Sequence, residues 1–314
     1  MLSWDTKEIF LNKVKSKGGF ACHHAHFDKA YLINEEALEI SQSSLQEKWK
    51  LYRKYKSEYT EEDLERRMTL CIENMISQGA KYCKTFVDAD SIVGLLPVKV
   101  MSSLKEKYKE QIKLEIAIQP LEGVLNPKTQ KTFIDACEIA DVIGGLPDRD
   151  ENPRQHVDFL MGLSKEMNKP IDIHVGQNNI PSEQETEMVV DRITYHRLEG
   201  RVNLVHAISL SCQPKRDRER IISKLRDTNT SVIVCPSAAL SMKQQSEKYA
   251  PIHNSIAPVM ELLEQDVNVL LGVDNIHDLF MPLVDGDLYF ESRLLMEAIR
   301  YYDLDKIAEI VSKS

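Results

Sequence analysis

Short apolar runs alternate with longer amphipathic segments along most of the chain. Eight runs have the length and the enrichment in branched residues expected of β-strands. Several are apolar throughout, which is typical of parallel strands covered by helices. The predicted strands comprise residues 20–24, 81–88, 114–120, 141–146, 170–175, 201–207, 231–236 and 267–274.

Amphipathic segments fill the intervals between these strands. A helix over 64–77 follows a capping motif that runs from Thr60 to Asp63. Eight alternating strand–helix units predict an α/β fold, a (β/α)8 TIM barrel, as one domain over residues 1–314 with a helical lead-in at 1–18. A doubly wound open sheet is the alternative, but no glycine-rich phosphate-binding motif follows any strand. The other predicted helices comprise residues 92–107, 128–140, 152–168, 183–199, 215–228 and 257–265.

Two segments depart from this regular alternation. Residues 35–59 are helical in pattern and rich in lysine, and we interpret them as a solvated excursion rather than a lid. Residues 236–254 are long for a loop between a strand and a helix, so this loop is a candidate cover for the mouth of the barrel, and its His253 is a minor candidate for a substrate contact.

Histidine and aspartate residues mark the carboxyl ends of four predicted strands. They are His24 and His26 after the first strand, His174 in the fifth, His206 in the sixth and Asp274 in the eighth. A barrel places its chemistry at these strand ends, so we expect the five side chains to meet. Imidazole and carboxylate ligands without thiolate predict a divalent metal, with zinc favoured and iron or manganese as alternatives.

A ligand set of this kind leaves a coordination position open for water, whose pKa a bound metal lowers toward ~7. We expect Asp274 to take the proton of that water and to pass it to the leaving group.

Composition and charge exclude several other classes of function. The formal charge is −9 with no basic tail, which argues against nucleic acid and anionic membranes as partners. No apolar run is long enough for a membrane helix, and the first residues lack the layout of a signal peptide. Six scattered cysteines without a C-x-x-C pair are typical of reduced thiols, so we expect a cytoplasmic protein.

Four segments resemble motifs of the amidohydrolase superfamily, in the branch of cytosine deaminase and N-isopropylammelide isopropylamidohydrolase. They are residues 24–29 (HAHFDK), 142–147 (VIGGLP), 173–174 (IH) and 272–278 (GVDNIHD). The resemblance implies a distorted (β/α)8 barrel with a mononuclear metal centre on His24, His26, His174 and Asp274. It also implies that His206 contacts the hydrolytic water or the substrate, and whether His206 ligates the metal stays open.

Two departures from this branch affect the prediction. Its deaminases carry a proton-relaying glutamate three residues after the strand-five histidine, where this chain has Gln177. An amide cannot act as a general acid, so proton handling falls on Asp274 and His206, or on a loop residue, and Gln177 is interpreted as substrate-orienting. The accessory β-sandwich of the family is expected to be absent or truncated, which would leave barrel surface for a homo-oligomer to cover.

The mouth of the predicted barrel supplies further candidate residues. With Gln177, we expect Asp148, His277, Asp278 and Lys29 to bind the small-molecule substrate. The predicted function is metal-dependent hydrolysis of a C–N bond in a small nitrogen heterocycle, with deamination first. Cyclic amide hydrolysis or N-dealkylation at the same site is the alternative reaction. The non-enzymatic alternative is a barrel that has lost catalysis and only binds a ligand.

Overall fold

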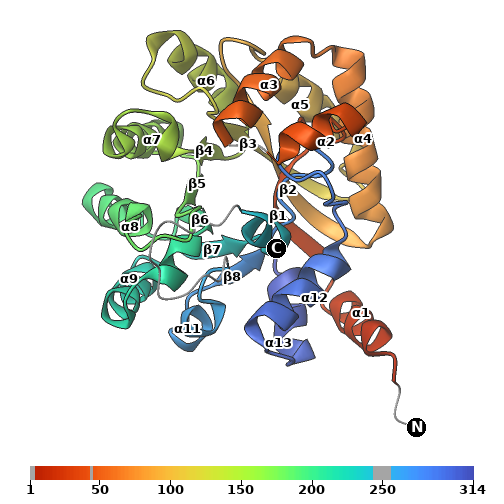
Figure 1. The fold of residues 1–314 in the computed structure, drawn as a ribbon, viewed down its shortest axis with the longest axis vertical. Coiled ribbons are helices and arrows are strands. Elements are labelled where there is room, and N and C mark those ends of the chain that lie inside the picture. Colours follow the sequence, from red (N-terminus) through yellow and green to blue (C-terminus); the bar gives the residue numbers. More distant parts are fainter. Residues whose placement is uncertain (1–3, 43–44, 243–255) are drawn as a thin grey trace.

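The computed structural model describes residues 4–42, 45–242 and 256–314. These residues form eight parallel strands that surround a common axis, and helices lie outside them (Figure 1). His253 and most of the loop expected over the mouth lie outside the described residues. The strands are β1 Phe20–His26, β2 Ala80–Asp88, β3 Lys113–Gln119, β4 Ile143–Gly145, β5 Ile171–Val175, β6 Val202–His206, β7 Ser231–Val234 and β8 Val269–Leu271.

The strands pair in two groups that meet at two seams. Strands β1 to β3 form one parallel ladder and β4 to β8 form the other. Ala117 bridges to Val142 at the first seam, and Ala25 bridges to Asp274 at the second. Few backbone hydrogen bonds cross each seam, so the fold is the predicted (β/α)8 barrel in a distorted form.

The described residues form thirteen helices and two short 3-10 turns; α1 precedes the first strand, α12 and α13 follow the last, and the others lie between strands. Side-chain oxygens cap several helix starts, as Asn34 does for α2 and Thr60 for α4. The helices are α1 Thr6–Ser16, α2 Glu35–Ser41, α3 Leu45–Ser57, α4 Glu61–Ser77, α5 Leu96–Tyr108, α6 Pro127–Ile139, α7 Pro153–Met167, α8 Glu185–His196, α9 Lys215–Asp227, α10 Pro236–Ser241, α11 Val259–Glu264, α12 Leu288–Ile299 and α13 Leu304–Ser312, and the turns are η1 Pro147–Arg149 and η2 Ile208–Cys212.

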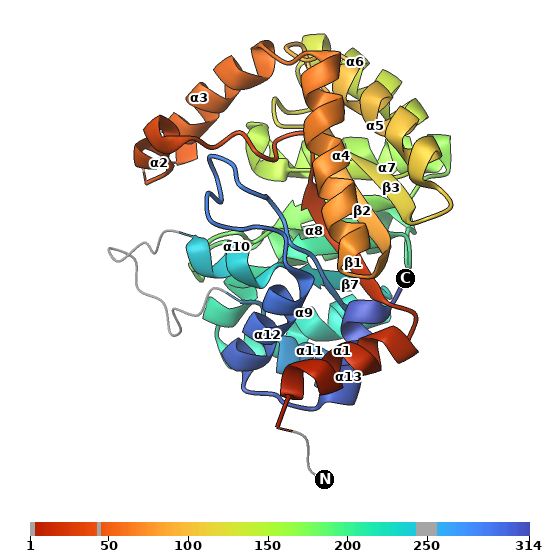
Figure 2. The same cartoon turned by 90° about the vertical axis from the view of Figure 1, so that its right-hand side faces the viewer.

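Segment 35–59 is not a solvated excursion. It forms α2 and α3, and Tyr52 and Lys56 of α3 are each only 1% exposed. In Figure 2, α2 and α3 lie at the same end of the barrel as α10, and the C-terminus lies at the opposite end. That interpretation failed because lysine-rich composition does not reveal which face of a helix meets carboxylates.

Two strands are shorter than predicted, and a glycine in or beside each one lies unusually close to a neighbouring strand. A Cβ atom on Gly144 of β4 would lie 1.8 Å from the carbonyl oxygen of Ile118. Strand β8 ends before Gly272, where a Cβ atom would lie 2.6 Å from that of His24. Both glycines permit close approach of the neighbouring backbone; Gly144 stays within the ladder of β4 and β5, whereas Gly272 directly follows the end of β8.

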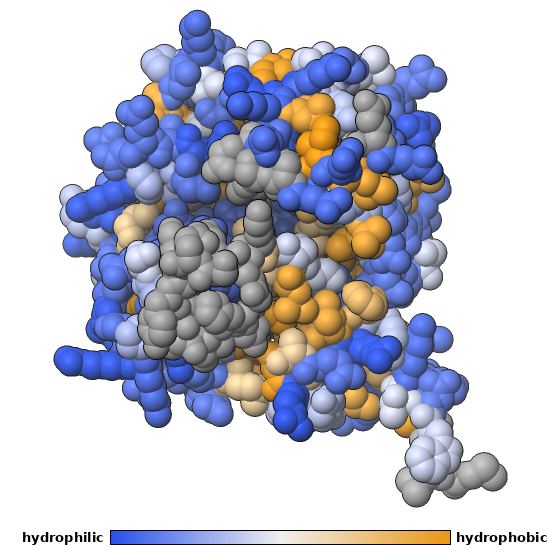
Figure 3. Space-filling view, viewed as in Figure 1, coloured by the Kyte–Doolittle hydropathy of each residue, from blue (hydrophilic) through white to orange (hydrophobic). Residues whose placement is uncertain are grey.

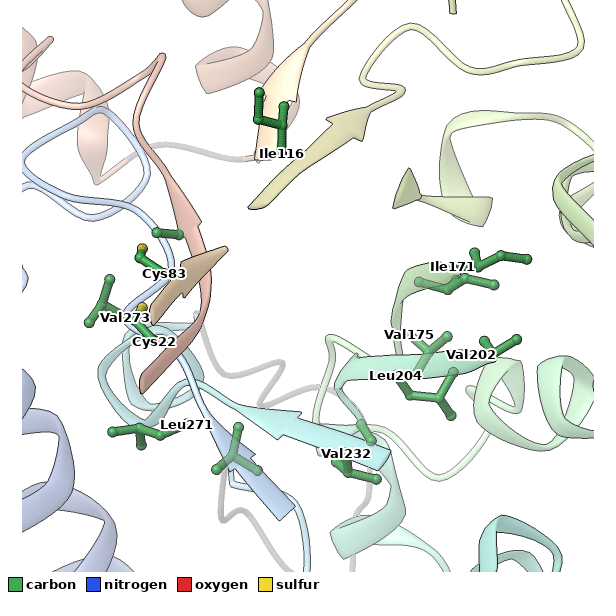
Figure 4. Packing of buried hydrophobic residues seen from close by; sticks show 14 of the residues in the cluster. Cys22, Cys83, Ile116, Ile171, Val175, Val202, Leu204, Val232, Leu271 and Val273 are labelled. Atoms are coloured by element: carbon green, nitrogen blue, oxygen red, sulfur yellow. The ribbon is translucent and has the colours of Figure 1, made fainter. Parts of the chain in front are cut away.

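The hydrophobic core lies between the outer faces of the strands and the helices. Alternate residues of β5 and β6, such as Ile171, Val175, Val202 and Leu204, belong to this buried cluster (Figure 4). The alternate positions of β5 face the interior of the barrel, where Lys84 of β2 pairs with Asp172 at 2.6 Å. The barrel interior is therefore polar at this level.

The outer surface is mostly hydrophilic, with an apolar area where Figure 1 places α12 (Figure 3). Leu283 and Phe290 are among the exposed large apolar residues. Self-association of the chain stays a prediction. Within the described residues, no helix combines the length and the apolar character needed to cross a membrane.

Candidate metal centre

An irregularity in β1 places two consecutive polar residues, His23 and His24, on the inner side of the strand. The pairing of β1 with β2 shifts register between Cys22 and Ala25, as a β-bulge does. Cys22 and Ala25 belong to the outer core, whereas His23 and His24 lie between them. Nε2 of His23 donates a hydrogen bond to the carbonyl oxygen of Lys313 at 2.6 Å, so this nitrogen already has a partner within the protein.

His24 and His26 stand at the carboxyl end of the same strand. Their ring centroids are 4.8 Å apart and the rings are nearly perpendicular. Phe86 of β2 packs against both rings and against His174, and it forms an apolar wall beside the three imidazoles. The sequence-based expectation that His24 and His26 lie together is met.

His174 reaches the same place from β5. Its Nδ1 donates a hydrogen bond to the carbonyl oxygen of Gly145 at 3.0 Å, and Nε2 has no hydrogen-bond partner. This contact fixes the ring orientation and leaves the lone pair of Nε2 available to bind a metal. The ring centroid lies 4.8 Å from that of His24.

His206 enters the group through an unusual backbone conformation. Val202 and Leu204 of β6 face the outer core, so regular alternation would send residue 206 outward as well. His206 instead has φ of 76°, and its Nε2 lies 3.8 Å from Oδ2 of Asp274. Positive φ in a residue other than glycine costs about 1–3 kcal/mol and is concentrated at functional sites.

Asp274 completes the group from the end of β8. Its Oδ1 lies 3.3 Å from Nε2 of His24 and 3.1 Å from Nε2 of His26. Asp274 also has positive φ, at 63°. Gly272 makes this approach possible, because any side chain there would collide with His24 and Cys235.

The four histidines and Asp274 form two overlapping sets of three side chains whose ligand atoms lie within 4.8 Å of one another. The first set is His24, His26 and His174, and the second is His24, His206 and Asp274. All are buried, and nitrogen atoms on each imidazole lack a hydrogen-bond partner. Buried polar atoms are normally satisfied, so this group of orphaned nitrogens fits a bound divalent cation.

The electrostatics of the group favour metal-binding forms of the side chains. Burial lowers the pKa of His26 to about 3 and that of His206 to about 4, and it lowers the pKa of His174 well below its usual value. Burial by itself would raise the pKa of Asp274, but the close approach of His24 and His26 to the carboxylate outweighs it and holds that pKa well below its usual value. Neutral imidazoles and an ionised carboxylate are the forms that ligate metals.

Asp148 and Gln177 lie near the ends of β4 and β5. Asp148, in turn η1, is exposed, and Gln177 is half-buried. Two glutamates brace the loop that carries Gln177. Glu183 accepts hydrogen bonds from N and Nδ2 of Asn178, both at 2.9 Å, and Glu185 accepts one from the backbone N of Gly176 at 3.1 Å.

The other three expected substrate contacts are engaged within the protein. Lys29 pairs with Asp88 at 3.2 Å and is buried. Asp278 accepts hydrogen bonds from the backbone of Phe280 and Met281, both at 2.8 Å, and thereby shapes the loop after β8. Nδ1 of His277 donates to the carbonyl oxygen of Pro282 at 3.1 Å.

The sequence patterns did not single out Asp88 and Gln119, two buried polar residues at strand ends. Gln119 is the last residue of β3 and is 4% exposed, and its Oε1 has no hydrogen-bond partner. The signal that identified the histidines, a polar side chain at a predicted strand end, applied to Gln119 as well. A single amide in a strand does not by itself indicate a metal site or a catalytic group, so Gln119 does not stand out in the sequence.

No family model matches the chain. An uncharacterized protein of Haemophilus influenzae is 35% identical over 264 residues, which are 82% of this chain and 95% of that protein. The N-isopropylammelide isopropyl amidohydrolase of a Pseudomonas species is 22% identical over 281 residues, which are 86% of this chain and 65% of that enzyme. The chain therefore spans just under two thirds of that enzyme's length.

Solved structures share the fold. The crystal structure of 5-methylcytosine deaminase from Klebsiella pneumoniae with 5-fluorocytosine superposes with a TM-score of 0.85 and 22% identity, and the match covers 93% of this chain and 72% of that one. An adenosine deaminase from Xanthomonas campestris with bound zinc gives a TM-score of 0.60 and 14% identity, over 90% of this chain and 61% of that one. The predicted barrel fold is confirmed.

Proposed function

We propose that this chain is a metal-dependent hydrolase of C–N bonds that belongs to the amidohydrolase superfamily; its similarity to the Pseudomonas amidohydrolase and its barrel fold support this. The chain belongs to the same family as the uncharacterized Haemophilus influenzae protein. Its proposed substrate is a small nitrogen heterocycle, and deamination is the favoured reaction. The observation that carries the proposal is the convergence of four buried histidines and Asp274 at the strand ends.

His24, His26, His174 and Asp274 are the proposed metal ligands. Imidazole nitrogens and one carboxylate suit Zn²⁺ best, with Fe²⁺ and Mn²⁺ as alternatives. When bound, such a metal supplies a water molecule whose pKa lies near ~7 and which can attack an electrophilic carbon. His206 stands beside this set, and its distance of 3.8 Å from Asp274 suits a group that contacts water or substrate.

Asp274 and His206 are the proposed proton carriers. Oδ1 of Asp274 faces His24 and His26, whereas Oδ2 faces His206, so the carboxylate has one oxygen on each side of the group. A carboxylate in this position can accept a proton from the attacking water and return it to the leaving nitrogen. His206 is mainly neutral near pH 7, because burial lowers its pKa, and it can donate or accept a hydrogen bond.

Gln177 and Asp148 are the proposed groups that orient the substrate directly. Both lie near strand ends on one side of the mouth. Lys29, His277 and Asp278 are proposed to act at the rim of the same pocket, where their existing hydrogen bonds and ion pair fix the loops that a substrate would touch. Gln119 joins this set because a buried amide oxygen without a partner can accept a hydrogen bond from a ring N–H.

A second candidate reaction is cyclic amide hydrolysis or N-dealkylation at the same site. The amide of Gln177 favours it, because deamination of a ring gains from a carboxyl that protonates the ring nitrogen. A ligand-binding role without catalysis is the remaining alternative.

Metal content and ammonia release test the proposal together. The double substitution His24→Ala with Asp274→Ala is expected to abolish both metal content and turnover of aminopyrimidine, aminopurine and aminotriazine probes. His23→Ala is the matched control, since His23 belongs to the same strand but binds the carbonyl of Lys313. Wild-type levels of metal in the double variant would overturn the ligand assignment. If the metal-loaded wild type releases no ammonia from any probe, deamination is not the reaction of this site.

A further inference from the structure

One peptide group joins the proposed ligand His174 to a second histidine, which lies in helix α7. The carbonyl oxygen of this group belongs to Gly145 and accepts the hydrogen bond from Nδ1 of His174 at 3.0 Å. Its N–H belongs to Leu146 and donates to Nε2 of His156 at 3.2 Å. The peptide is trans, so its C=O and N–H point in opposite directions. The two imidazoles therefore bind opposite sides of the same peptide group.

Asp150 extends this contact to a carboxylate. Nδ1 of His156 lies 2.7 Å from Oδ2 of Asp150. Because the backbone N–H of Leu146 can only donate, Nε2 of His156 must accept, and Nδ1 carries the proton that Asp150 receives. The carbonyl of Gly145 can only accept, which fixes the proton of His174 on Nδ1 in the same way. All three hydrogen bonds donate in the direction of Asp150, so each bond polarises the next.

This hydrogen-bonded chain is buried along its whole length. His156 is 0% exposed, His174 is 3% exposed and the side chain of Asp150 is 8% exposed. Burial by itself would raise the pKa of Asp150, but the hydrogen bonds from His156 and from backbone N–H groups hold that pKa below its usual value. The chain therefore ends on an ionised carboxylate in a region where hydrogen bonds are stronger than in water.

Backbone groups of another connection hold Asp150 in place. Its Oδ2 accepts from the N–H of Val124 at 2.8 Å, and its Oδ1 accepts from the N–H of Leu125 at 3.2 Å. Both donors follow β3, whereas Asp150 follows β4. The Gly145 backbone is confined as well, because a Cβ atom there would lie 2.6 Å from the side chain of Leu160 in α7. Both ends of the chain are therefore fixed by packing that does not involve a metal.

We propose that Asp150 and His156 are positioning residues of the metal centre, which orient His174 and raise the electron density on its Nε2 through the peptide between Gly145 and Leu146. When His156 accepts from the peptide N–H, the carbonyl oxygen of the same peptide becomes more negative and binds the Nδ1 proton of His174 more strongly. A stronger bond at Nδ1 makes Nε2 a better metal ligand. The effect on metal binding rests on the proposed function, whereas the hydrogen-bonded chain itself does not.

Two substitutions of His156 interrupt the chain at different points. His156→Asn keeps an N–H donor at about the position of Nδ1, so it can still bind Asp150, but it offers no acceptor to the N–H of Leu146. His156→Gln keeps an oxygen at about the position of Nε2, so it can still accept from Leu146, but it loses the hydrogen bond to Asp150. Both variants remove the imidazole ring, so a role in packing alone would affect them alike.

Competition with a chelator measures the affinity of each variant for Zn²⁺. His156→Asn is expected to bind Zn²⁺ about tenfold or more weakly than the wild type, as is typical when an outer partner of a metal ligand is lost, and His156→Gln is expected to fall between the two. Wild-type affinity in His156→Asn, or an equal loss in both variants, would contradict the proposal.

A second histidine–aspartate pair supplies the matched control for these variants. Nε2 of His196 lies 2.8 Å from Asp158, and His196 is the last residue of α8, away from the strand ends. His196→Asn is expected to leave the affinity for Zn²⁺ unchanged. A loss in His196→Asn as large as that in His156→Asn would show that the effect does not pass through His174, and the proposal would fail.

Asp150→Asn tests the far end of the chain and covers the case in which His156→Asn fails to fold. The amide keeps the shape of the carboxylate but removes its charge, and one of its two ends can only donate. At least one of the hydrogen bonds that Asp150 accepts is therefore lost. The affinity for Zn²⁺ is expected to fall, and wild-type affinity in folded Asp150→Asn would exclude a role for this carboxylate.

Proton and nitrogen-15 NMR of the metal-free protein observes the chain without turnover or metal. In His156→Asn and in Asp150→Asn, the Nδ1 proton of His174 is expected to resonate upfield of its wild-type position and to exchange faster with water, because the carbonyl of Gly145 becomes a weaker acceptor. An unchanged resonance in both variants would overturn the proposal. If the wild type binds no Zn²⁺, the proposed ligand set fails, while this resonance still decides whether His156 and Asp150 act on His174.

Discussion

Oδ1 of Asp274 lies 3.1 Å from Nε2 of His26, which joins the end of the last barrel strand to the end of the first. The backbone repeats this link, because the N–H of His26 donates to the carbonyl oxygen of Asp274 at 3.2 Å. Closure of the barrel and assembly of the proposed metal centre are therefore one structural event. A change that separates β1 from β8 should disturb both.

Substitution of Gly272 tests this coupling. In Gly272→Ala the new Cβ would lie 2.6 Å from Cβ of His24 and 2.9 Å from Sγ of Cys235. Overpacking of this kind costs about 1–3 kcal/mol, so we expect a lower free energy of unfolding and reduced metal content. Urea denaturation and elemental analysis measure the two effects.

Gly162→Ala is the control for that variant. Gly162 lies within α7, and a Cβ atom there would meet no atom within 4 Å. Alanine is favoured over glycine in a helix by about 1 kcal/mol, so this variant should be slightly more stable with full metal content. Equal metal content in both variants would contradict the coupling between seam and site.

Replacement of Asp274 by asparagine separates charge from shape. Asp274→Asn keeps the size of the side chain but removes the charge that faces His24 and His26. We expect weaker metal binding and a loss of turnover of about 10²-fold or more, since a proton acceptor is lost as well. Turnover at the wild-type rate in metal-loaded Asp274→Asn would exclude Asp274 as the proton carrier.

Restoring a carboxyl at position 177 tests the favoured reaction. Gln177→Glu places a group that can transfer protons in the loop after the proposed ligand His174. We expect ammonia release from an aminopyrimidine to rise by about tenfold or more, as general acid–base catalysis allows. Gln184→Glu adds the same charge at an exposed position and should leave the rate unchanged. A rate in Gln177→Glu no higher than in this control would favour the alternative reactions.

The pH dependence of stability should report on Glu291. This residue is 1% exposed and accepts a hydrogen bond from the backbone N of Ser237 at 3.0 Å, and burial raises its pKa to about 7. A carboxyl whose pKa is raised on folding binds more protons in the folded state, so the free energy of unfolding falls as pH rises from about 4.5 to about 7. The loss amounts to roughly 3 kcal/mol for this shift.

Glu291→Gln should remove that part of the pH dependence. The amide keeps an oxygen for the Ser237 N–H but cannot ionise. Urea denaturation at pH 5 and pH 8 should show a smaller difference for Glu291→Gln than for the wild type. Glu297→Gln, at an exposed position of the same helix, should retain the wild-type difference. Identical pH profiles for the wild type and Glu291→Gln would contradict this account.

The sequence by itself determined the fold class and the members of the proposed metal centre. Alternating strand-like and helix-like segments are local patterns, and a parallel barrel brings all strand ends to one face, so His24, His174 and Asp274 could be placed together without coordinates. Period-two alternation likewise placed His24 and His26 on one face. The sequence did not reveal the bulge at His23, because a register shift depends on the neighbouring strand.

Only the tertiary structure decided which polar residues of the connecting segments are buried. Lys56 and Tyr52 belong to a lysine-rich segment whose composition suggests a solvated helix, yet both are buried against Asp88. Lys29 and Asp278 had the chemistry of substrate contacts, but their partners come from β2 and from the backbone of Phe280. Such pairings join residues from different connections of the barrel, and their energy depends on burial, which a linear pattern does not specify.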